Sequence, residues 1–165
     1  MALVIGTDTY ISQTDATAYV TANYASAEAK RVAWVALSSD DKDSYLRRAT
    51  KKIDSLVLVG VKVEVTQALE FPRAVFTDST LYQTPFHSSL YIQQDVPEEV
   101  KFAQVEIALD LAVGPSTRVT LQREGVKSFS LGKLSEDYGS GKAQALCFEA
   151  NELMKVYLAG GVQIV

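Results

Sequence analysis

The chain has 165 residues, of which 47% are hydrophobic and 22% are charged, and its formal net charge is −4. These values are typical of one folded domain, which at this length buries roughly 70% of the surface of its unfolded chain, and they exclude wholesale disorder. The acidic balance excludes a nucleic-acid binder whose whole surface is basic, but leaves room for a local basic patch. No apolar run approaches the roughly 18 residues of a membrane span, and the apolar start at residues 2–5 is too short for a signal peptide. We therefore expect an intracellular protein with no membrane contact.

Three helices are predicted in the first third of the chain. Thr14 and Asp15 offer cap side chains for a short helix over residues 16–24. A second helix is predicted over residues 28–37, with Trp34 as a core anchor. The third, over residues 40–57, has apolar side chains at three- and four-residue steps and aspartates in its first turn, where they complement the helix dipole.

The middle of the chain has weaker periodicity, followed by one strong helix. Valines alternate with charged residues over 61–65, which predicts either a short strand or an irregular loop. Residues 77–95 show neither a helical nor a strand period and predict a long loop, which either binds a partner or stays mobile. Residues 96–113 have Pro97 and two glutamates in their first turn and apolar side chains around most of the circumference, which predicts a central helix packed on several sides.

A β-hairpin and an arm are predicted for the last third. Apolar residues alternate on both sides of Glu124 and Gly125, which indicates a hairpin over about 118–132. Residues 139–165 are expected to form a C-terminal arm, with an amphipathic helix over 142–158 and an apolar tail. The sequence thus predicts a single, mainly α domain: a helical bundle around a central helix at about 96–113, with a β-hairpin and a C-terminal amphipathic helix.

No catalytic, metal or cofactor site is predicted. His87 is the sole histidine and Cys147 the sole cysteine. Together they cannot satisfy a structural zinc site, and their separation in the chain disfavours a nucleophile–base arrangement. The glycine-rich residues 139–142 lack the spacing of a phosphate-binding loop. We therefore expect a protein that is not an enzyme and that needs no cofactor.

A cluster of four cations is predicted on the helix over residues 40–57, opposite its apolar side. Its members are Arg47, Arg48, Lys51 and Lys52. The first interpretation is a solvated face that Asp43 and Asp54 partly neutralise. The alternative is a contact surface for DNA or another acidic partner.

Several short motifs follow one another along the chain, at residues 33–37, 42–54, 67–73, 95–100, 103–112, 123–127 and 158–161. Their order and spacing resemble those of the head-to-tail adaptor (head-completion) proteins of tailed bacteriophages. The resemblance covers most of the chain, although Phe71 stands where such proteins commonly have tryptophan, and the loop over 77–95 is longer than theirs.

That resemblance implies a structural virion protein of the phage neck, assembled in the cytoplasm of the host bacterium. Copies of the chain, commonly twelve, would form a ring beneath the portal protein and above a stopper or tail-completion protein. The ring would extend the DNA channel, and DNA would pass through its lumen without sequence-specific binding. Rings of this kind close when one face of each subunit fits a different face of the next.

The resemblance also indicates interface residues. Candidates for portal contact are Leu146, Leu153, Tyr157, Leu158, Val162, Ile164 and Val165. Candidates for contact with a neighbouring subunit or neck protein are Phe71, Pro72, Arg73, Tyr82, Phe86 and Tyr91. Whether Phe71 is a core residue or an intersubunit plug stays open, and the C-terminal tail can pack either on its own domain or on the portal.

Two alternatives stand beside the adaptor. Some sequences with these motifs are described as single-stranded-DNA-binding, primosome-like proteins, and an unrelated helical interaction module is the other choice. Binding of single-stranded DNA usually combines a positive groove with aromatic residues on which bases stack. The basic cluster has Tyr45 as its one aromatic neighbour. On this ground we expect an adaptor and no tight DNA binding near physiological salt.

Overall fold

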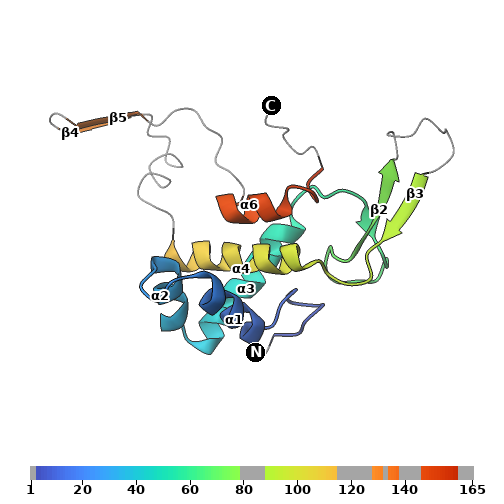
Figure 1. Ribbon diagram of the computed structural model, residues 1–165, viewed down its shortest axis with the longest axis horizontal. Helices are drawn as coiled ribbons and strands as arrows, with labels where there is room; N and C mark the ends of the chain where they lie inside the picture. Colours follow the sequence, from blue (N-terminus) through green and yellow to red (C-terminus); the bar gives the residue numbers. More distant parts are fainter. Residues whose placement is uncertain (1–2, 79–87, 115–127, 132–133, 138–145, 160–165) are drawn as a thin grey trace.

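The computed structural model describes residues 3–78, 88–114, 128–131, 134–137 and 146–159 (Figure 1). Its helices are α1 (Gln13–Asn23), α2 (Ala29–Ala36), α3 (Ser39–Asp54), α4 (Glu98–Val113) and α6 (Phe148–Met154). Its strands are β1 (Val61–Lys62), β2 (Arg73–Asp78), β3 (Ser88–Ile92), β4 (Ser128–Leu131) and β5 (Leu134–Asp137). The described part is mainly α with small antiparallel sheets, which confirms the predicted fold class.

Serine side chains cap two of the first three helices. The Oγ atom of Ser12 accepts a hydrogen bond from the Asp15 amide at 3.0 Å, so α1 begins earlier than the predicted cap at Thr14 and Asp15. The Oγ atom of Ser38 caps α3 in the same way. Trp34 of α2 is fully buried, which confirms it as a core anchor.

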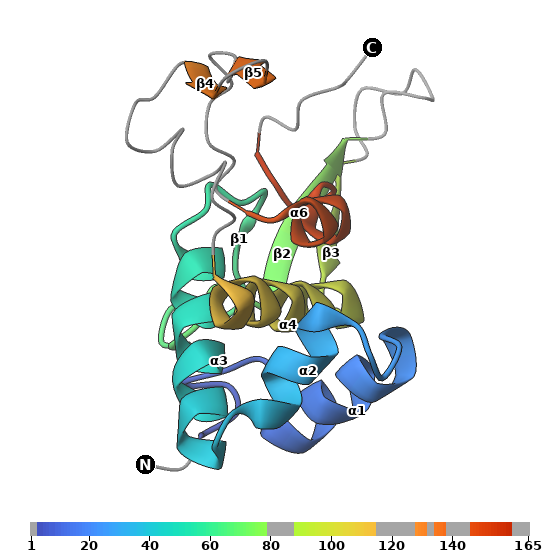
Figure 2. The ribbon, with the colours of Figure 1, turned by 90° about the vertical axis from the view of Figure 1, so that its left-hand side faces the viewer.

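Helix α4 is the centre of the bundle. It contacts α1, α2, α3 and α6, and Figure 2 shows α1 and α2 on one side of it and α6 on the other. Every side chain from Ala103 to Leu109 is buried, a run that covers the whole circumference of the helix. This confirms the predicted central helix, which begins two residues later than expected.

Helix α4 carries one buried amide, Gln104, which forms hydrogen bonds with two other segments of the chain. The Nε2 atom of Gln104 lies within hydrogen-bonding distance of three acceptors, which share its two hydrogens: the Oγ1 atoms of Thr9 and Thr50 at 2.7 and 2.9 Å and the Leu46 carbonyl at 3.0 Å. Its Oε1 atom accepts from the Tyr10 amide at 3.0 Å. Since a buried amide is costly without partners, these bonds fix α3 and the N-terminal segment on α4.

A second buried polar group, Glu106, links α4 to the first two helices. Its carboxylate accepts hydrogen bonds from the hydroxyls of Tyr19 and Tyr24 at 2.9 and 2.6 Å and pairs with Lys30 Nζ at 3.0 Å. Lys30 also reaches Glu149 of α6 at 3.2 Å. Burial, followed by the hydrogen bond to Glu106, raises the pKa of both tyrosines above the ordinary value.

The three-stranded sheet has the order β1-β2-β3, and each pair is antiparallel. Strand β3 and the last two residues of β2 lie within the predicted loop over 77–95, so that prediction was wrong for residues 77–78 and 88–92, while residues 79–87 lie outside the described part. The absence of a strand pattern in the sequence of β3 has a physical cause. Tyr91 and Ile92 are consecutive and both exposed, at 60% and 45%, so these two residues do not alternate between a buried and an exposed side chain.

The C-terminal elements also differ from the prediction. The described hairpin pairs β4 with β5, from Ser128 opposite Asp137 to Leu131 opposite Leu134. It lies further along the chain than the hairpin predicted around Glu124 and Gly125, which are outside the described residues. Helix α6 begins only after Cys147, whose backbone is extended, and is shorter than the helix predicted over 142–158.

Candidate nucleic-acid interface

Helix α3 has one buried face and one basic face. The buried face consists of Leu46, Ala49, Thr50 and Ile53, each no more than 2% exposed. On the other side Arg48 and Lys51 are exposed and Arg47 and Lys52 are half-buried. Figure 2 shows α3 along one side of the helical bundle. The structure therefore brings the four predicted cations together on one face, which we call the basic face of α3.

The distribution of charge along α3 follows the helix dipole. Asp40 and Asp41 lie in the first turn and Lys51 and Lys52 in the last. Acids near the amino end and cations near the carboxyl end each stabilise a helix by about 0.3–1 kcal/mol. This arrangement of acids and cations concentrates positive charge in the second half of α3.

The cations of the basic face differ in their contacts. Arg47 Nε lies 3.8 Å from Asp8 Oδ2, and the Arg48 guanidinium lies over the Tyr45 ring, 5.5 Å from its centroid. Lys51 and Lys52 form no ion pair with any residue that the structure describes. Their charge is therefore available to an external anion.

The two aspartates expected to neutralise the basic face are engaged elsewhere. Asp43 is buried at 9% exposure, and Asp54 accepts a short hydrogen bond from the Tyr10 hydroxyl. Desolvation raises the pKa of the Asp54 carboxyl above its ordinary value, since burial disfavours the charged form. Neither aspartate forms an ion pair with Lys51 or Lys52.

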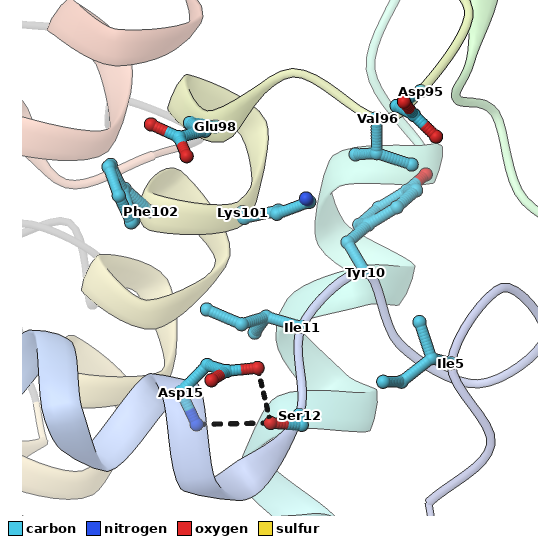
Figure 3. A pocket seen from close by; sticks show the side chains of 10 residues that line it. All are labelled: Ile5, Tyr10, Ile11, Ser12, Asp15, Asp95, Val96, Glu98, Lys101 and Phe102. Atoms are coloured by element: carbon cyan, nitrogen blue, oxygen red, sulfur yellow. Dashed lines mark hydrogen bonds between the residues drawn. The ribbon is translucent and has the colours of Figure 1, made fainter.

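A hollow between the starts of α1 and α4 is a poorer candidate for binding an anion. Figure 3 shows Asp15, Asp95 and Glu98 along its rim, with Lys101 as the single cation among the lining residues. Asp15 also accepts a hydrogen bond from the Ser12 hydroxyl at 2.6 Å, as part of the α1 cap. The excess of carboxylates repels phosphate, so this hollow is not a nucleic-acid site.

The segment at residues 67–73 faces the interior of the domain. Phe71 is 3% exposed and makes edge-on contacts with the rings of Tyr10 and Tyr157, whose centroids lie 6.0 and 5.4 Å away. The backbone carbonyl of Pro72 accepts a hydrogen bond from Gln67 Nε2 at 3.0 Å. Phe71 is thus a core residue of its own domain, and its ring is not available to a neighbouring subunit.

Arg73 is also enclosed, because its side chain is 7% exposed and its guanidinium binds acceptors of the preceding residues. Its Nε atom donates to the Val59 carbonyl at 2.8 Å and one terminal nitrogen donates to the Gly60 carbonyl at 2.5 Å. The other pairs with Glu70 at 2.5 Å. Gly60 has φ +81°, and a Cβ atom there would lie 2.2 Å from the Ala74 carbonyl oxygen, so this loop approaches β2 too closely for a larger residue.

The C-terminal candidates that the structure describes pack on the same domain. Leu146 is buried, whereas Leu153, Tyr157 and Leu158 are half-buried against the core. The Tyr157 carbonyl accepts from the amide of residue 59, and the amide of residue 159 donates to the carbonyl of residue 57, both at 2.8 Å. Residues 157–159 thus lie beside the loop after α3.

Of the other predicted interface residues, Tyr91 is 60% exposed on β3. Five candidates lie outside the described residues: Tyr82, Phe86, Val162, Ile164 and Val165. In the described ranges, no helix has the length and apolarity to cross a membrane, and no group of three or more potential metal-ligating side chains gathers.

A family model described as "Putative DnaT-like ssDNA binding protein" matches residues 1–164. The chain belongs to this family. No curated protein and no solved structure matches it.

Membership of the DnaT-like family overturns the identification as a phage head-to-tail adaptor, together with the portal-binding ring in the virion neck that it implied. The physical reason lies in the motifs behind the resemblance. Residues 67–73 place Phe71 and Arg73 inside the domain, and residues 95–100 begin the central helix. Such motifs specify how the chain packs, which says little about the partner that it binds.

Proposed function

We propose that this protein binds single-stranded DNA, without catalysing a reaction, through the basic face of α3. The observation that carries the proposal is the gathering of four cations on one side of a helix in an otherwise acidic chain. The description of the DnaT-like family supports single-stranded DNA as the ligand. The proposal corresponds to the primosome-like alternative, and the expectation of no tight DNA binding is withdrawn with the adaptor.

The electrostatics favour one defined contact surface. Phosphates attract lysine and arginine, and binding releases the counterions condensed on the DNA. Because the chain as a whole carries −4, the remaining surface is unfavourable for DNA, and a strand is directed to the basic face. Lys51 and Lys52 are suited to this role since binding DNA would break no existing ion pair with the described residues.

The test is a titration of a fluorescent oligothymidine of about 15 nucleotides, near the upper footprint of a small single-strand-binding domain, followed by anisotropy at several salt concentrations. We expect the affinity of the natural protein to fall as salt rises. The double variant K51A/K52A should bind more weakly, and its slope of log affinity against log salt should be shallower by about 1.4, or about 0.7 for each lost phosphate contact.

A matched variant controls for the loss of two charges. Lys101 lies in α4 and Lys155 follows α6, where it pairs with Glu152 at 3.0 Å. K101A/K155A should therefore bind like the natural protein, and both double variants should keep its melting temperature. Absence of binding even at low salt, or an equal loss of affinity in both variants, would contradict the proposal.

A further inference from the structure

We infer that Tyr45 and Arg48 form a stacking platform for one unpaired base on the basic face of α3, an inference that rests on the proposed function. The Arg48 guanidinium carbon lies 5.5 Å from the centroid of the Tyr45 ring. Tyr45 is half-buried and packs against the hydrophobic core, whereas Arg48 is exposed. The ring is thus anchored from the inside, and the guanidinium forms the outer layer.

This pair differs from the two other cation–ring contacts among the described residues. The ammonium group of Lys30 lies over the Tyr24 ring but forms ion pairs with Glu106 and Glu149. Lys42 lies over Trp34, whose ring is fully buried. Arg48 is the exposed member of the three, and it has no ion pair with the described part of the chain. A ligand can therefore reach its guanidinium without displacing a carboxylate.

The chemistry of the guanidinium suits a nucleobase. It is planar and delocalised, and bases stack on such planes as they do on aromatic rings. A cation over a tyrosine ring is attracted by the negative face of the ring, which reduces the cost of orienting the guanidinium plane for a base. The arrangement we infer is a stack in the order ring, guanidinium, base.

The helix register brings phosphate-binding groups close to this platform. Residues 45, 48 and 52 are separated by steps of three and four, so they lie along one stripe of α3. Lys51 and Lys52 are about 5 Å beyond Arg48 along the helix axis, at 1.5 Å per residue. A nucleotide stacked on Arg48 thus has lysines within reach of its phosphates.

The platform explains why the site would prefer single strands. In a duplex both faces of each base are covered by neighbouring bases, so Arg48 can stack only on an unpaired base. An acidic peptide, by contrast, would use the charge of the basic face but not the plane of Arg48. The predicted signature is therefore a contribution of the bases to affinity that depends on the guanidinium plane.

The experiment compares the natural protein with Arg48→Lys, which keeps the charge and removes the plane. Three probes are titrated: oligothymidine, an abasic oligodeoxynucleotide of the same length, and a duplex of the same length. The natural protein should bind oligothymidine about tenfold more tightly than the abasic strand, within the range measured for stacking of one base. In Arg48→Lys this preference should fall to about twofold or less, with affinity for the abasic strand unchanged.

A second pair of variants tests the tyrosine. Tyr45→Phe retains the ring and should retain the preference for bases, whereas Tyr45→Leu fills the core without a ring and should lose it. Melting temperatures show whether each variant is folded. If Tyr45→Leu does not fold, the result for Arg48→Lys alone decides whether the stacking platform exists.

The failures of the two proposals can be told apart. The platform would be overturned by an unchanged preference for bases in Arg48→Lys, or by equal affinity of the natural protein for the three probes. In either case, weaker binding of DNA by K51A/K52A would still support the proposed function. An oligouridine ribonucleotide of the same length is titrated beside the three probes, and its tighter binding than oligothymidine would overturn DNA as the occupant. No binding of any probe would overturn the proposed function as well.

Discussion

Two arginines, Arg73 and Arg48, show how differently the same side chain is used in this domain. Arg73 is enclosed, and its guanidinium donates to Val59, Gly60 and Glu70. Arg48 is exposed, rests on the ring of Tyr45, and has no ion pair with the described residues. The first arginine holds a loop in place, whereas the second is free to meet a ligand.

The more distinctive of the two sequences is the one whose side chains are used inside the domain. Residues 67–73 stand out in the sequence, yet Phe71 packs on aromatic rings of the core and the Arg73 guanidinium binds Glu70 and two loop carbonyls. The basic face is an ordinary stretch of lysine and arginine on a helix. It becomes a candidate site because the neighbouring aspartates are buried or bonded elsewhere, and because Lys51 and Lys52 form no ion pair with the described residues. A cation is a candidate for recognition when the fold leaves it without an internal partner.

The largest expected effect comes from breaking the enclosed cluster. Arg73→Met removes the donors and leaves Glu70 and the two loop carbonyls without their partner. We expect the free energy of unfolding to fall by about 3 kcal/mol, the loss typical of breaking a buried ion pair from one side. Urea denaturation at neutral pH measures this loss.

Arg73→Lys is the control for charge in that experiment. One ammonium group cannot reach Val59, Gly60 and Glu70 in the geometry of the planar guanidinium, so this variant should lie between the natural protein and Arg73→Met. A loss below about 1 kcal/mol in Arg73→Met would mean that these contacts behave as a surface pair, and the contrast with Arg48 would disappear.

A smaller effect is expected from Tyr157, whose ring packs on Phe71 and whose hydroxyl donates to Glu99 at 3.2 Å. Burial, followed by the charge of Glu99, raises its pKa from 10.0 to about 12. Because the folded state holds this proton more tightly than the unfolded state, the contribution to stability is complete below pH 10 and is lost as the pH rises through 12.

Tyr157→Phe should therefore flatten the alkaline part of the stability profile. Tyr10, Tyr19 and Tyr24 also have raised pKa values and remain in both proteins, so the difference between the two profiles isolates Tyr157. Denaturation curves between neutral pH and pH 12 provide the comparison. Profiles of equal steepness would show that the Tyr157 hydroxyl is not held in the folded state.

Much of the fold could be predicted from the sequence because the helices carry a strong local signal. The apolar steps of α3, the glutamates that open α4 and its apolar circumference each indicate an element independently of the rest of the chain. Strand β3 could not be predicted in this way, since its stability depends on pairing with β2 and its neighbouring Tyr91 and Ile92 are both exposed.

The candidate site was predicted in part. The four cations of α3 and the neighbouring Tyr45 are visible in the sequence, and their spacing places them on one side of a helix. The sequence could not show that Asp43 is buried and Asp54 is bonded to Tyr10, because these contacts join distant segments. It therefore suggested a neutralised face, and the inward orientation of Phe71 and Arg73 was equally hidden.

The most direct test of the account is the map of amide chemical shifts of the ¹⁵N-labelled protein during titration with oligothymidine. The account predicts that the shifts of residues 45–55 change most, while those of residues 67–73 and of the hollow around Lys101 stay near their starting values. Changes concentrated at the hollow or at residues 67–73, with α3 unaffected, would contradict it.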